Sequence, residues 1–90
     1  MEKFYLKATD EFFSIIDNIK SSNDLNIVLI VPSGVNALRS IINLRILKEE
    51  CNFLGKNIYI STTDDLIKKL ATQAKIKILQ PQQPKQSKKN

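Results

Sequence analysis

Histidine is absent from this 90-residue chain, and Cys51 is its only cysteine. Without histidine there is no His-based acid–base catalyst and no Ser-His or Cys-His nucleophile pair, and one cysteine cannot make a zinc finger or an internal disulfide. We therefore predict a protein that is not an enzyme, binds no cofactor and holds no metal. A single free thiol favours a reducing, cytoplasmic location.

Long hydrophobic runs are also missing. The longest uninterrupted apolar run is 27–32, far below the roughly 20 residues that span a bilayer, so we expect no membrane span in this chain. The first residues include Glu2 and Lys3 and precede no apolar run of about 7 to 15 residues, so no signal peptide is predicted. The length is below the roughly 100 to 200 residues usual for one domain, which limits the fold to one small core.

Basic residues outnumber acidic ones, 14 to 9, but part of the excess lies in one short segment. Lys85, Lys88 and Lys89 fall within residues 80–90, which contain no acidic residue and are otherwise rich in Gln and Pro. Such a segment has no apolar side chain to offset the entropy of ordering it. We therefore divide the chain into an α/β domain, residues 1–79, and a disordered Gln/Pro/Lys tail or linker, residues 80–90.

Strands and helices alternate in the first half of the domain. Residues 4–8 form a short aromatic and apolar run typical of a strand. Thr9 can cap a helix whose apolar residues recur at helical spacing over 12–19. Residues 27–31 are five consecutive apolar residues, which favours a central strand covered on both sides, as in a parallel sheet.

The second half continues this alternation. A long helix is predicted over 35–54, with Gly55 as its left-handed terminator; 57–61 is a third strand, and 76–79 closes the domain as a strand after a third helix. The order β-α-β-α-β-α-β implies right-handed parallel crossovers. The predicted fold class is therefore α/β, with a four-stranded, mainly parallel sheet and helices on its faces: a minimal Rossmann-like or flavodoxin-like three-layer unit.

Four segments between Ile27 and Ile76 carry a resemblance to a known family. They are IVLIVPSG at 27–34, LRSIINLRILK at 38–48, LGK at 54–56 and STTDD at 61–65. Together they resemble a small N-terminal α/β domain of uncharacterised bacterial proteins, many of them similar to membrane-anchored baseplate J-like proteins. The resemblance implies a cytoplasmic adaptor domain followed by a flexible linker, with no known activity. Ser33 and Lys75 depart from the family pattern, which usually has a basic residue and a glycine at these two places.

Ser33, Gly34 and Val35 follow a predicted central strand and precede a helix. At this position open α/β sheets commonly bind ligands, and free backbone N–H groups attract anions. The segment has neither a G-x-G-x-x-G nor a G-K-S/T motif. It therefore lacks the residues that let a backbone loop approach a pyrophosphate closely. These residues are a candidate ligand or anion loop, and a structural turn is the favoured alternative.

Asp64 and Asp65 follow Thr62 and Thr63, either of which can cap the third helix. Carboxylates in the first turn are favoured by the helix dipole without any ligand. We therefore interpret the two aspartates as part of the helix start and not as a metal site.

The long predicted helix carries more apolar surface than one sheet face needs. One stripe contains Leu38, Ile42 and Ile46, and we expect it to face the sheet. Arg39 and Arg45, about 240° apart around a straight helix, are expected to be solvated charges. A second stripe runs from Ala37 to Leu54, and in the alternative interpretation neighbouring helices on the same sheet face cover it. We assign the later turns of the second stripe to an interface with a protein partner or a second copy of the chain, formed by Leu44, Leu47, Cys51 and Leu54.

Two functions remain open. The first is a non-enzymatic protein-interaction or adaptor module of unknown specific role. The alternative is a small basic nucleic-acid-binding protein that uses Lys85, Lys88 and Lys89 together with lysines of the domain surface. Binding to phosphates would weaken steeply with salt, whereas an apolar interface would not.

Overall fold

The computed structural model describes residues 1–80 of the chain, so the predicted tail lies, apart from Gln80, outside the described residues. Strands and helices alternate as expected, which confirms the α/β class and the β-α-β-α-β-α-β order. The elements are β1 (Glu2–Tyr5), α1 (Phe12–Ser21), β2 (Asn26–Val31), the 3-10 helix η1 (Asn36–Leu38), α2 (Ile41–Phe53), β3 (Asn57–Thr62), α3 (Asp65–Gln73) and β4 (Lys77–Leu79).

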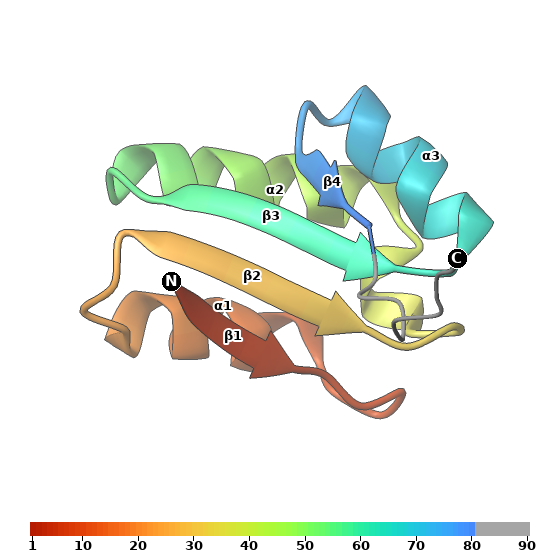
Figure 1. The fold of residues 1–90 in the computed structure, drawn as a ribbon, viewed down its shortest axis with the longest axis horizontal. Coiled ribbons are helices and arrows are strands. Elements are labelled where there is room, and N and C mark those ends of the chain that lie inside the picture. The colour runs from red at the N-terminus through yellow and green to blue at the C-terminus, as the bar shows by residue number, and fades with distance from the viewer. Residues whose placement is uncertain (81–90) are drawn as a thin grey trace, which may run out of the picture.

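The four strands form one parallel sheet in the order β1-β2-β3-β4. Each strand is added beside the one before it in the chain, so the sheet grows in one direction from β1 to β4. Because parallel crossovers are right-handed, such an order brings every connecting helix to the same face of the sheet. In Figure 1 the helices lie behind the sheet, and α2 contacts both α1 and α3.

This helix placement differs from that of a doubly wound unit. Rossmann and flavodoxin sheets reverse their direction of growth at a switch point, which sends helices to both faces. The described strands contain no such reversal. Within residues 1–80, therefore, the side of the sheet that faces the viewer in Figure 1 carries no helix.

The core fills the space between the sheet and the helices. From β2, Ile27 and Leu29 point into it, and both are fully buried. Helix α1 adds apolar residues at helical spacing, as predicted, although it begins after Glu11 and not after Thr9. The fully buried side chains of the core also include Ile15, Ile19, Leu38, Leu44, Leu47, Cys51, Ile60, Ile67 and Ala71.

The long helix predicted over 35–54 is interrupted. Helix η1 covers Asn36–Leu38, and α2 begins at Ile41. Ser40 is the N-cap of α2: its side chain accepts a hydrogen bond from the Asn43 amide at 3.2 Å. The Asn43 side chain also donates to the Ala37 carbonyl at 3.0 Å. A serine in this role satisfies a free amide of the helix start, which is why the helix begins anew here.

Helices α2 and α3 end in the same way. After α2, Gly55 has a φ of +70° and the Lys56 amide donates to the Cys51 carbonyl at 2.8 Å. After α3, Lys75 has a φ of +64° and the next amide donates to the Ala71 carbonyl at 2.9 Å. The left-handed residue favours glycine in this motif, so the terminator predicted at Gly55 is confirmed and Lys75 occupies a position suited to glycine.

Candidate binding surface on the open face of the sheet

The predicted ligand loop folds against an acidic residue of its own chain. Gly34 has a φ of +88°, and its amide donates to Asp64 Oδ2 at 2.9 Å. Val35 is fully buried. Arg39 reaches the same carboxylate oxygen through Nε and Nη2, both at 3.1 Å. The carboxylate therefore occupies the place that a bound anion would take, and the structure favours the alternative that this loop is a structural turn.

Asp64 joins the loop after β2 to the start of α3. It is the N-cap of α3, with Oδ1 accepting hydrogen bonds from the Leu66 and Ile67 amides at 3.0 and 3.1 Å. Desolvation of the buried carboxyl acts to raise its pKa, but hydrogen bonds from Gly34, Ile67 and Arg39 outweigh it, so the pKa lies below its ordinary value.

Two expectations about this cluster are corrected. The cap of α3 is Asp64 and not Thr62 or Thr63, because the carboxylate reaches two free amides of the first turn; the Thr62 hydroxyl accepts from the Asp64 amide instead. Arg39 is not simply solvated, since it pairs with Asp64. In the part of the chain that the structure describes, no three metal-ligating side chains come together.

The interface predicted on the second stripe is also corrected. Leu44, Leu47 and Cys51 are fully buried in the core, and Leu54 packs against it half-buried. Ile42, expected to face the sheet, is 66% exposed. Leu38 of the same predicted stripe is buried, but within α2 the orientation is the reverse of the prediction, because the helix begins anew at Ile41 and turns its Leu44 side toward the sheet.

Cys51 is a structural residue of this core. It is a free cysteine, and desolvation raises the pKa of its thiol to about 11. At neutral pH it is therefore protonated, and a buried thiol of this kind behaves as a small hydrophobe. The other predicted contacts, Lys85, Lys88 and Lys89, lie outside the described residues.

The side of the sheet opposite the helices, here called the open face, presents two rows of side chains. The strand registers pair every residue of a row with its neighbours on the adjacent strands. Apolar residues of β2 lie at the centre of each row: Val28, which is only 2% exposed, and Ile30, which is half-buried. The first row is Lys3, Val28, Tyr59 and Lys77, and the second is Tyr5, Ile30, Ser61 and Leu79.

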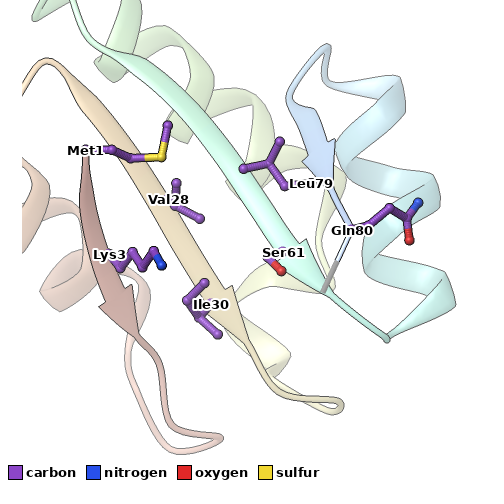
Figure 2. A pocket seen from close by; sticks show the side chains of 7 residues that line it. All are labelled: Met1, Lys3, Val28, Ile30, Ser61, Leu79 and Gln80. Atoms are coloured by element: carbon purple, nitrogen blue, oxygen red, sulfur yellow. The ribbon is translucent and has the colours of Figure 1, made fainter. Parts of the chain in front are cut away.

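A shallow apolar trough runs along the open face. Its first part, of about 260 Å³, is shown in Figure 2, where the Val28 and Ile30 side chains lie between Lys3 and Leu79. A second hollow of about 280 Å³ shares Ile30 and Ser61 with the first and continues to the carboxyl ends of the strands. The trough is lined by Met1, Lys3, Tyr5, Leu6, Val28, Ile30, Val31, Pro32, Ser61, Thr62, Thr63, Leu79 and Gln80.

A smaller cleft of about 110 Å³ opens where β3 and β4 begin, beside α2. Three lysines line it, and none of its lining residues is acidic. Tyr59 also lines it and stands between Val28 and Lys77 in the first row of the open face. We call it the lysine cleft; its lining residues are Lys48, Asn57, Ile58, Tyr59, Lys75 and Lys77.

The acidic residues within and next to the first two strands are paired with other groups of the chain. Glu2 is the only acidic residue within the four described strands. It is in register with the core residue Ile27, and its carboxylate accepts a hydrogen bond from Ser22 at the end of α1. Asp24 precedes β2 and pairs with the amino group of Met1 at 3.0 Å. The strands therefore present lysine but no carboxylate on the open face.

Comparisons with family models, curated proteins and solved structures found no match to this chain. The resemblance to the N-terminal α/β domain of baseplate J-like proteins therefore stays a prediction. None of the described helices has the length and apolar character needed to cross a membrane. The function is accordingly inferred from the geometry of the open face.

Proposed function

We propose that this domain is a non-enzymatic interaction module that holds a macromolecular partner on its open face. The observation that carries the proposal is the apolar trough on a sheet whose opposite face already forms the core. Contiguous apolar surface with a polar border is typical of docking sites on soluble domains. Ile30 and Leu79 are half-buried there beside the buried Val28, and all three lie outside the main core cluster.

The two larger hollows described above lie on the open face and not on the helical side. Its exposed apolar residues include Phe13 on α1, Ile42 and Phe53 on α2, and Leu66 on α3. Ile46, one turn from Ile42, is 39% exposed as well, and exposed apolar residues in such small numbers are normal on soluble proteins. The buried carboxylate of Asp64 accepts hydrogen bonds from backbone amides of its own chain and is therefore committed to the fold. This supports a non-enzymatic role for the domain.

Site-specific photocrosslinking tests this proposal. A benzophenone amino acid replaces Ile30 on the open face in one variant and Ile42 on α2 in the matched control, and both variants are irradiated in cells. We expect covalent adducts at position 30 that are absent at position 42. Circular dichroism of both purified variants establishes that they are folded. Adducts at position 42 alone, or none at position 30, would contradict the proposal.

A further inference from the structure

We infer that the partner is a single-stranded nucleic acid, with its bases on the open face and its phosphates on the surrounding lysines. This inference rests on the proposed function of the open face. It follows from three features of that surface: its charge, its aromatic residues and the junction between trough and lysine cleft.

The charge of the surface favours an anionic partner. Lys3 and Lys77 stand at the two ends of the first row, on the outer strands β1 and β4. Lys48 and Lys75 join Lys77 in the lysine cleft. Lysine is depleted in protein–protein interfaces, whereas lysines that follow a groove are typical of proteins that bind nucleic-acid backbones. Lys75 has a left-handed backbone conformation that glycine would adopt more easily. The lysine at this position adds a positive charge to the cleft.

The aromatic residues favour unpaired bases. Tyr5 in the second row is 71% exposed, and Tyr59 in the first row is partly exposed. A four-stranded sheet that stacks about two or three bases on its aromatic side chains is an established mode of single-stranded RNA recognition. Bases inside a duplex are already stacked on each other, so a duplex is excluded as the preferred ligand.

Tyr59 connects the two kinds of contact. It lines the lysine cleft and also lies next to Val28, which lines the trough. Adjacent strands are about 4.8 Å apart, so the four strands span about 14 Å. A strand of nucleic acid crossing from β4 to β1 would meet Lys77 and Tyr59 first, then the partly exposed Ile30 of β2, and finally Lys3.

Fluorescence anisotropy with the full chain and a labelled oligouridylate of about ten nucleotides tests the inference. We expect binding that weakens with salt. Tyr5→Ala should weaken it by about fivefold or more, the effect of removing one base stack. Phe53→Ala, which removes an aromatic residue that is 87% exposed on α2, should change it by less than about twofold. Tyr5→Leu keeps apolar area and tests whether the aromatic ring itself is needed.

The lysines have a matched control as well. Replacing both Lys3 and Lys77 by Gln should reduce the slope of log affinity against log salt by about 0.7 for each phosphate that the protein no longer neutralises. The same double change at Lys68 and Lys69 on α3 removes equal charge from the helical side and should leave the slope nearly unchanged. Replacing Lys85, Lys88 and Lys89 by Gln measures the contribution of the tail lysines to the same slope.

Three binding results would overturn the inference. They are the absence of oligouridylate binding, equal effects of Tyr5→Ala and Phe53→Ala, and binding of an oligoglutamate peptide with the same dependence on Tyr5. The last result would make the partner an acidic polypeptide and leave the proposed function intact. Backbone amide shifts during the titration should change along β1 to β4, and changes confined to the helices would also overturn it. Photocrosslinking at position 30 decides separately whether the open face binds any partner.

Discussion

At the scale of single residues, Asp64 is the clearest source of pH-dependent stability. Its pKa lies below the ordinary value of 3.8 in the folded chain, so it binds fewer protons there than in the unfolded chain at acidic pH. Its stabilising contribution is therefore complete above about pH 4 to 5 and is lost as the pH falls through the lowered pKa.

Asp64→Asn should lower the free energy of unfolding at neutral pH by about 1 to 3 kcal/mol, because the Gly34 amide and Arg39 lose a charged acceptor. Urea unfolding at several pH values measures this effect. The difference between wild type and variant should shrink below about pH 4. Asp24, whose pKa is also lowered, keeps part of the acid dependence in both proteins. A difference that stays constant down to about pH 2 would contradict the assignment.

Lys75 provides a second prediction at this scale. Lys75→Gly should stabilise the fold by about 0.5 to 1 kcal/mol, because a residue with a side chain is strained at a φ of +64°. Gly55→Ala at the equivalent end of α2 should have the opposite effect, since its φ is +70°. Thermal unfolding should show shifts of opposite sign, of about 4 to 8 °C for each kcal/mol. Shifts of the same sign would mean that the two helix ends are not equivalent.

At the scale of elements, the sequence predicts which segments are strands and helices better than it predicts what covers them. The apolar run at 27–31 correctly indicates a central strand. The same apolar residue types occur under a helix layer and on a docking surface, so the run does not show what covers each face of the strand. The strict alternation at 57–61, with Asn57, Tyr59 and Ser61 between isoleucines, was the available signal for a sheet with one open face. The cap at Ser40 was missed because apolar residues continue at helical spacing on both sides of it.

The reversed stripes of α2 give a prediction for this element. Leu47→Ala should lower the free energy of unfolding by about 2 to 5 kcal/mol, because Leu47 is fully buried. Ile42→Ala, on the exposed side of the same helix, should change it by less than about 0.5 kcal/mol. Chemical denaturation of both variants measures the contrast. Equal losses would mean that Ile42 is covered in the native chain.

At the scale of the whole molecule, the two faces of the sheet have different roles, and one substitution made on each face separates them. Ile60→Thr places a hydroxyl in the closed core, where Ile60 is fully buried, and should cost about 2 to 4 kcal/mol of unfolding free energy. Ile30→Thr keeps a β-branched residue on the open face and should cost less than about 1 kcal/mol.

The pair of variants also tests whether the open face is free to bind. Wild type and Ile30→Thr should have similar melting temperatures, while Ile30→Thr should weaken oligouridylate binding because the hydroxyl interrupts the apolar centre of the trough. If Ile30→Thr is as destabilising as Ile60→Thr, Ile30 is packed inside the folded chain and cannot contact a partner. An open face that binds a partner requires similar stability together with weaker binding. If Ile30 only stabilised the fold, its replacement would lower the melting temperature and would not weaken binding specifically.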